Sequence, residues 1–287
     1  MYYFLSLLMG ILISVMVAFN GGLTAEYGVY GATVIIHITG LLLISAIVLF
    51  NRENPFSSRQ AWYLYLGGAI GVLTTIFNNL AFGRISVSAI LALGLLGQSI
   101  AGLVIDQYGL FGMEKYLFNR KKIIGLILIL LGIGAMINNF EIIAVVVSFI
   151  AGINIALSRT LNAKLSDHTS VRVSTFFNYF IGLGLSVLAF AIISRNESVF
   201  TNFTISPHLF IYFGGILGVC VVLMGNITAL KISAFYLTLL IFVGQVFSGV
   251  LIDIIIAQVF SPRNFFGGTL VALGLCVNLL LDRSNSV

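Results

Sequence analysis

Apolar residues in this chain are gathered into runs of about 20 residues, and short stretches containing polar or charged residues separate these runs. A helix needs about 20 mostly apolar residues to cross the hydrocarbon core of a bilayer. Ten runs approach this length, at residues 2–23, 30–50, 62–83, 86–105, 121–138, 142–160, 171–193, 209–230, 233–257 and 264–281. The pattern therefore predicts an all-α polytopic membrane protein with ten transmembrane helices.

The connections between these runs are short, so we expect consecutive helices to be antiparallel. Only residues 51–61, 106–120 and 194–208 are long enough to place much of the chain outside the bilayer. These stretches leave no room for a cytosolic domain, and no phosphate-binding G-x4-G-K-[ST] loop occurs in the sequence. ATP is therefore a poor candidate for an energy source.

Composition supports a membrane environment. Hydrophobic residues make up 60% of the chain and charged residues only 8%, whereas soluble domains carry about 25% charged residues. So few charges cannot cover a water-facing surface, which makes the lipid bilayer the main partner of the chain. The net charge is +5, but the basic residues stand singly between apolar runs and form no patch of the kind that nucleic acid requires.

Lysine and arginine are distributed unequally between the two sides of the expected helix bundle. The side of the N-terminus holds eleven of them: Arg52, Arg59, Lys115, Arg120, Lys121, Lys122, Arg159, Lys164, Arg172, Lys231 and Arg283. The opposite side holds three: Arg84, Arg195 and Arg263. Since cytoplasmic loops are enriched in Lys and Arg, we expect both termini to be cytoplasmic.

The two halves of the chain resemble each other. Residues 64–106 align with residues 211–253 at an offset of 147, and fourteen of the 43 positions are identical, including Gly, Asn, Gln and Asp. Flanking regions match at an offset of 142, where Gly10, Asn20, Gly40, Gly125 and Gly132 meet Gly152, Asn162, Gly182, Gly267 and Gly274. The change of offset falls in loops, where insertions are tolerated.

This similarity predicts two five-helix repeats, at residues 1–138 and 139–287. Because each repeat has an odd number of spans, the second copy must be inverted relative to the first. Inverted repeats are typical of secondary transporters that work by alternating access, with the substrate site near the midplane between the halves.

The repeated motifs also carry a family resemblance. The stretch Gly97-Gln98-x3-Gly102-x2-Ile105-Asp106, with its second copy Gly244-Gln245-x3-Gly249-x2-Ile252-Asp253, and the Asn20-x2-Leu23 element resemble the YdcZ-like branch of the drug/metabolite transporter (DMT) superfamily. The resemblance implies ten helices as five plus five (an EamA-like fold) and a location in the bacterial plasma (inner) membrane. Small relatives in that superfamily couple protons through a glutamate inside the first helix. Here Glu26 lies beyond the end of that helix, which departs from the pattern.

Two glutamines are candidate substrate-binding residues. Gln98 and its repeat mate Gln245 lie inside spans, and in both copies Gln, Gly and Asp fall at i, i+4 and i+8, on roughly one helical face. A glutamine offers a ligand both a donor and an acceptor. The alternative is a hydrogen bond between helices that only stabilises the bundle.

Other polar residues in or near the spans are further candidates, because polar groups in lipid face the protein interior or a cavity by default. Candidates for substrate contact are Asn79 with its mate Asn226, and His37 with its mate Tyr179. Candidates for coupling or gating are Asp106, Asp253, Asn20 and Asn162. Capping or helix–helix hydrogen bonding remains open for each of them.

Four glycines are expected to serve helix packing. Gly67 and Gly71 are spaced by four, as are their repeat mates Gly214 and Gly218. Small residues at this spacing allow helices to approach closely. These surfaces are candidates for the faces that move against each other during transport.

The sequence therefore favours a secondary transporter, in particular an exporter of small metabolites or amphipathic compounds. A channel or a non-transporting assembly partner is the alternative. No H-E-x-x-H, G-x-S-x-G or metal-ligand cluster supports an enzyme, and no catalytic residue, cofactor or metal is expected. With no charge expected deep in a span, the cargo is expected to be neutral, zwitterionic or hydrophobic. The protein is expected to be a monomer or a homodimer.

Overall fold

The computed structural model describes residues 1–115, 122–136, 141–193, 205–257 and 261–283, and within these ranges the chain is helical with no β-strand. The helices are α1 Tyr2–Phe50, α2 Leu66–Ala81, α3 Val87–Tyr108, α4 Lys122–Met136, α5 Ile142–His168, α6 Val171–Ile193, α7 Gly214–Thr228, α8 Ala234–Ala257 and α9 Pro262–Arg283. Short 3-10 turns at Trp62–Tyr65 and Leu209–Phe213 lead directly into α2 and α7. These helices follow the apolar runs of the sequence closely.

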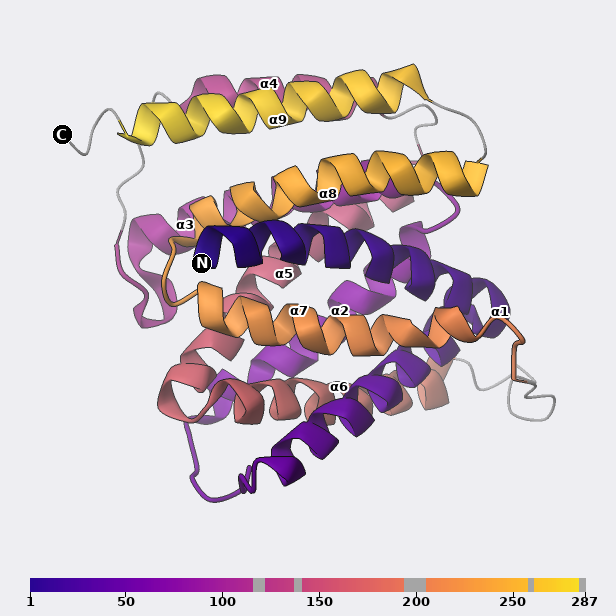
Figure 1. Cartoon of the computed structure of the whole chain (residues 1–287), viewed down its shortest axis with the longest axis vertical. Coiled ribbons are helices and arrows are strands. Elements are labelled where there is room, and N and C mark those ends of the chain that lie inside the picture. The colour runs from indigo at the N-terminus through magenta and orange to yellow at the C-terminus, as the bar shows by residue number, and fades with distance from the viewer. Residues whose placement is uncertain (116–121, 137–140, 194–204, 258–260, 284–287) are drawn as a thin grey trace.

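Helix α1 combines the first two apolar runs and is broken at Gly28. The backbone of Gly28 has φ 71° and ψ 171°, a conformation that glycine reaches readily because it has no Cβ. Figure 1 shows α1 running from the N-terminus across the molecule and then turning back. Gly28 therefore supplies the turn between two antiparallel segments.

The helices lie side by side across the molecule, and α4 and α9 form a pair along one edge with α3 and α8 next to them (Figure 1). Glycines allow α4 and α9 to approach closely. A Cβ on Gly132 would lie 2.5 Å from the carbonyl oxygen of Gly267, and one on Gly274 would lie 2.6 Å from that of Gly125. Apolar side chains of α3, α4, α8 and α9 form one buried cluster behind this contact.

Two further helix contacts depend on glycines in direct backbone contact. A Cβ on Gly10 of α1 would lie 2.9 Å from the Cα of Gly244 in α8. A Cβ on Gly97 of α3 would lie 3.1 Å from the Cα of Gly152 in α5. No larger residue fits at either place without moving a helix, since the neighbouring atoms are backbone.

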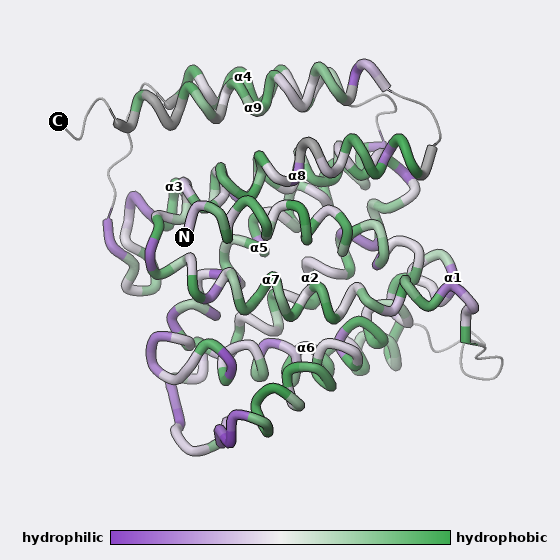
Figure 2. Tube along the Cα trace, in the orientation of Figure 1, coloured by the Kyte–Doolittle hydropathy of each residue, from purple (hydrophilic) through white to green (hydrophobic). Residues whose placement is uncertain are grey.

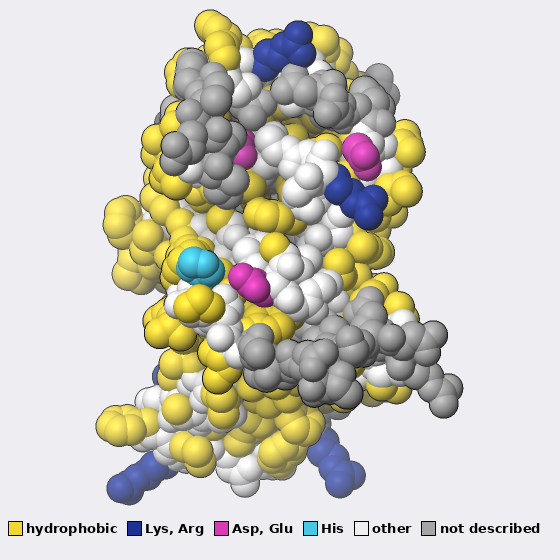
Figure 3. All heavy atoms as spheres, turned by 90° about the vertical axis from the view of Figure 1, so that its right-hand side faces the viewer, with side chains coloured by type: hydrophobic (Ala, Val, Ile, Leu, Met, Phe, Trp, Pro, Cys, Tyr) yellow, Lys and Arg dark blue, Asp and Glu magenta, His cyan; other side chains and the backbone are white. Residues whose placement is uncertain are grey.

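The outer faces are suited to lipid. Seven of the described helices are long and apolar enough to cross a membrane, and α4 and α9 contain shorter apolar stretches, Ile123–Met136 and Phe265–Gly274. Large apolar side chains such as Ile127, Leu131, Ile192 and Ile255 are exposed on these faces. Figure 2 shows hydrophobic residues along the helices and hydrophilic residues gathered toward their ends. Lys and Arg side chains are sparse on the end viewed in Figure 3.

One expectation about charge is wrong. The sequence counts Arg159, at the end of the run 142–160, among the cations of the cytoplasmic side, but α5 continues to His168 and Arg159 lies inside the helix, facing other helices. A charged residue can lie within such a helix when its side chain has a polar partner inside the protein, and Arg159 has one in Gln98. Lys164, another cation counted on the N-terminal side, also lies within α5.

Candidate functional site

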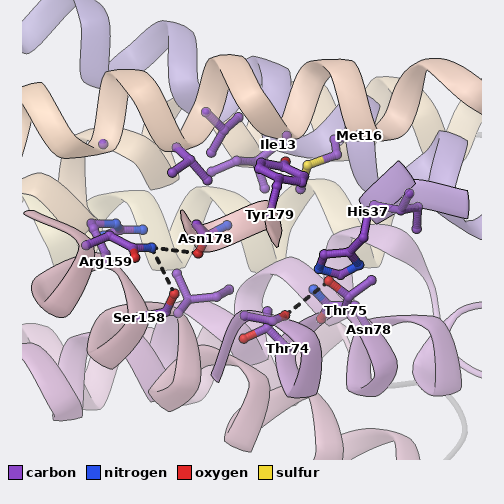
Figure 4. A pocket seen from close by; sticks show the side chains of 18 of the residues that line it. Ile13, Met16, His37, Thr74, Thr75, Asn78, Ser158, Arg159, Asn178 and Tyr179 are labelled. Carbon is purple, nitrogen blue, oxygen red and sulfur yellow. Dashed lines mark hydrogen bonds between the residues drawn. The ribbon is translucent and has the colours of Figure 1, made fainter. Parts of the chain in front are cut away.

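A cavity of about 160 Å³ lies between five helices. Its walls come from both segments of α1 and from α2, α5, α6 and α7 (Figure 4). The lining residues are Met9, Ile13, Met16, Asn20, Ile36, His37, Gly71, Thr74, Thr75, Asn78, Ile155, Ser158, Arg159, Asn162, Asn178, Tyr179, Gly218, Val221, Val222, Gly225 and Asn226.

Helical periodicity places these side chains on the inner faces. In α2 the lining residues Gly71, Thr74, Thr75 and Asn78 fall at i, i+3, i+4 and i+7. The same spacing recurs in α5 and in α7. Residues at this spacing share one face of a helix, so α5 and α7 each turn a mixed polar and apolar stripe toward the cavity, and α2 turns a polar one.

At one end of the cavity lies Arg159. Its guanidinium Nη2 donates a hydrogen bond of 2.8 Å to Oε1 of Gln98, whose side chain is only 2% exposed. Gln98 comes from the middle of α3 and does not line the cavity itself. Gln98 therefore orients Arg159 from the side that faces away from the cavity.

A network of amide and hydroxyl groups lies beside Arg159 (Figure 4). Nδ2 of Asn162 donates to Oδ1 of Asn178 at 2.8 Å and to Oγ of Ser158 at 3.3 Å. The Ser158 hydroxyl in turn donates to the carbonyl oxygen of Gly67 at 2.7 Å. These groups are neutral and bonded to each other, so they do not balance the charge of the guanidinium.

The other end is polar but uncharged. Nδ1 of His37 lies 2.7 Å from the carbonyl oxygen of Thr33. A carbonyl only accepts, so Nδ1 must carry the hydrogen and Nε2 of the neutral ring is left as an acceptor. Thr74, Thr75 and Asn78 lie beside His37, and Ile13, Met16 and Tyr179 lie between this end and Arg159 (Figure 4).

One buried acceptor on the cavity wall has no partner. Oδ1 of Asn20 makes no hydrogen bond with any described group, although Asn20 is only 7% exposed. It lies against Gly214, where a Cβ would collide with it. A buried acceptor of this kind is costly unless a ligand or water satisfies it.

The structure brings some of the candidate residues of the sequence analysis together and leaves others outside. His37, Tyr179, Asn20, Asn162, Asn226, Gly71 and Gly218 line the cavity, whereas Gln98, Gln245, Asn79, Asp106, Asp253, Gly67 and Gly214 do not. Gly67 and Gly214 instead make room for the side chains of Asn162 and Asn20. Asn79 and Asn226 both bond threonine hydroxyls, of Thr33 at 3.3 Å and Thr175 at 3.2 Å.

Asp253 has a structural environment. Its carboxylate accepts hydrogen bonds from the backbone N–H groups of Val87 at 3.0 Å and Ser88 at 3.2 Å, and from the Ser88 hydroxyl. These are the first residues of α3, whose N–H groups have no partner within the helix. Asp253 therefore caps α3 from α8. Asp106 is buried at the other end of α3.

Sequence reasoning missed Arg159, Ser158 and Asn178. The repeat contained the missing signal, because the offset of 142 aligns Arg159 with Val17, which lies within the first apolar run. The expectation of a site without charge is therefore wrong, since a charged side chain does lie within a membrane-capable helix.

Comparisons with known proteins agree with the helical architecture. A family model described as “Putative inner membrane exporter, YdcZ” matches residues 1–135 and 143–277. A solved structure titled “Crystal structure of protein” is similar in fold, with a TM-score of 0.69 and 14% sequence identity over 98% of this chain and 97% of that one. No curated protein matches the chain by sequence.

Proposed function

This chain belongs to the YdcZ family of the drug/metabolite transporter superfamily, and we propose that it is a secondary transporter that exports small molecules through the cavity described above. In this proposal the chain has ten spans in two inverted units, residues 1–138 and 139–287. The two segments of α1 count as two spans, and α4 and α9 are the fifth and tenth.

The composition of the cavity wall is the observation that carries the proposal. Eighteen of the 21 lining residues are pairs related by the repeat offsets of 142 or 147. The pairs are Ile13 and Ile155, Met16 and Ser158, Asn20 and Asn162, Ile36 and Asn178, His37 and Tyr179, Gly71 and Gly218, Thr74 and Val221, Thr75 and Val222, and Asn78 and Gly225. A site built equally from two inverted repeats is typical of transporters.

Contacts between the units support the same arrangement. Gly67 faces Asn162, and their repeat mates Gly214 and Asn20 face each other. The pair Gly10 and Gly244 is likewise matched by Gly152 and Gly97. Two halves with equivalent contacts can exchange conformations at little cost in free energy, so that the cavity opens to one side and then to the other.

The energy source in this proposal is an ion gradient or the gradient of the substrate. Both termini are proposed to be cytoplasmic, which follows from the bias of loop lysines and arginines. Export then moves a substrate from the end of the molecule that carries the N-terminus to the end viewed in Figure 3.

Flux through purified protein in proteoliposomes tests this function. We expect transport to saturate with substrate concentration, because each cycle requires the cavity to load and reorient. Currents or tracer flux should be measured on a solid-supported membrane with a panel of acids, amines, amino acids and sugars. Flux that rises linearly without saturation would indicate a channel, and the absence of flux from folded protein would contradict a transporter.

A further inference from the structure

We propose that the substrates of this cavity are small organic monocarboxylates, held by their carboxylate at Arg159. This inference rests on the proposed function, because it names the class of molecule that the transporter would carry. It replaces the neutral, zwitterionic or hydrophobic cargo that the sequence alone favours.

The charge of the cavity points to an anion. Among the residues that line it, Arg159 is the one formally charged side chain, and none of them is Asp or Glu. Within the described parts of the chain, the ion pairs Arg84–Glu141 and Arg172–Glu53 leave Arg159 without an acidic partner. Arginine stays protonated, and an unbalanced charge within a membrane-spanning helix is costly. A bound anion would remove that cost.

The geometry leaves the guanidinium available. Its bond to Gln98 uses one donor of five. Because Gln98 approaches from α3, outside the lining, the remaining face of Arg159 can turn to the cavity. Two parallel N–H donors match the two oxygens of a carboxylate.

The charge of a single arginine favours a monoanion. A dianionic phosphate would keep one unbalanced charge in a site that offers no second cation among its lining residues. The size of the cavity, about 160 Å³, limits the ligand to a small molecule. A carboxylate on a small organic body fits both conditions.

The other residues that line the cavity indicate what the rest of the substrate should be. Ile13 and Met16 provide an apolar middle (Figure 4), where a hydrocarbon or aromatic group can lie. The far end, around His37 and Asn78 (Figure 4), offers hydrogen-bonding groups. Monocarboxylates with an apolar body and a small polar group at the opposite end should therefore bind best.

Binding to the purified full chain in detergent tests the inference. We would use two matched pairs of probes, benzoate with benzamide and lactate with lactamide, and follow thermal stabilisation as a function of probe concentration. Each pair has nearly the same shape and differs in charge. We expect at least one acid to stabilise the wild-type protein at concentrations about tenfold or more below its amide, the range for a hydrogen bond to a charged group. Equal effects of acid and amide in both pairs would overturn the inference.

Variants test whether Arg159 is responsible for the preference for an acid over its amide. Arg159→Gln should abolish the preference for the acid and leave any binding of the amide. Arg84→Gln is the matched control, since Arg84 has a side chain 45% exposed and lies outside the cavity; it should keep the wild-type preference. If Arg159→Gln does not fold, Arg159→Lys is the test instead. This variant keeps the positive charge but lacks the two parallel N–H donors of the guanidinium, so it should weaken acid binding several-fold. An unchanged acid Kd in that variant would overturn the inference.

The two proposals can fail separately. Flux of neutral or cationic compounds alone would contradict the anion site and leave the transporter. Specific binding of acids at Arg159 without any flux would contradict the transporter and leave the anion site.

Discussion

The rings of His37 and Tyr179 lie with their centroids 5.8 Å apart, tilted by 52°, and each packs against a glycine three residues after the other ring. His37 lies against Gly182 of α6, and Tyr179 lies against Gly40 of α1. The Tyr179 hydroxyl also donates to the carbonyl oxygen of Gly215 at 3.3 Å. The two rings therefore join α1, α6 and α7 on one side of the cavity.

Replacing Gly40 with Ala should destabilise the protein. The added Cβ would collide with the ring of Tyr179, which is buried and cannot move freely. Overpacking of this kind costs about 1–3 kcal/mol, and the better helix propensity of Ala offsets about 1 kcal/mol of it. Gly184→Ala is the control, because no atom lies within 4 Å of a Cβ there. The free energy of unfolding in mixed micelles should fall for Gly40→Ala and not for Gly184→Ala; equal values would contradict the packing.

The two repeated glutamines should differ in function. Gln98 accepts the bond from Arg159, whereas Oε1 of Gln245 has no partner in the described structure. Gln98→Met should reduce flux, because Arg159 loses the group that orients it. Gln245→Met should keep flux and leave stability equal or higher, since it removes a buried unsatisfied acceptor. Transport kinetics of both variants in proteoliposomes test this difference. A similar loss of flux in both would show that the two glutamines act as an equivalent pair.

Asp253→Ala should loosen the start of α3. The carboxylate accepts from the N–H groups of Val87 and Ser88, and loss of a cap costs about 0.5–2 kcal/mol. Hydrogen exchange at these two amides should accelerate in Asp253→Ala and less in Asp253→Asn, which keeps an acceptor oxygen. Unchanged protection in Asp253→Ala would show that the cap contributes nothing to α3.

The contact of Glu53 with α6 should make stability depend on pH. The hydrogen bond from Arg172, with Nε at 2.7 Å from Oε1, and the bond from the Ser170 hydroxyl hold the pKa of the Glu53 carboxyl below its ordinary value. A group whose pKa is depressed by folding stabilises the protein above its unfolded pKa, about 4.3, and loses this contribution as pH falls through the folded value.

Glu53→Gln removes this titration. The difference in melting temperature between wild type and Glu53→Gln should be constant near neutral pH and shrink below about pH 4. A difference that stays constant down to the acid limit of folding would contradict the role of the ion pair.

Much of the architecture was predictable because bilayer thickness imposes a strong length constraint on apolar runs. The run at 171–193 coincides with α6 Val171–Ile193, and the others differ by a few residues, apart from the far end of α5. The site was less predictable. Gln98 carries the clearest motif yet lies behind the cavity, and Arg159 stands at the end of the apolar run 142–160, where a cation at the membrane surface is the ordinary expectation. Both positions depend on which side chains meet between neighbouring helices. The length and spacing of apolar runs carry no information about such contacts.

Counterflow in proteoliposomes with one cavity-filling variant tests the central claim, that the cavity is the substrate path of a transporter. A Cβ on Gly71 would lie 3.6 Å from Oδ1 of Asn178, so Gly71→Leu fits the backbone and fills the cavity, while Gly184→Leu adds the same side chain on an exposed surface. Vesicles loaded with unlabelled benzoate or lactate should accumulate the labelled acid with wild type and Gly184→Leu, and not with Gly71→Leu. Equal counterflow in the two variants would contradict the account.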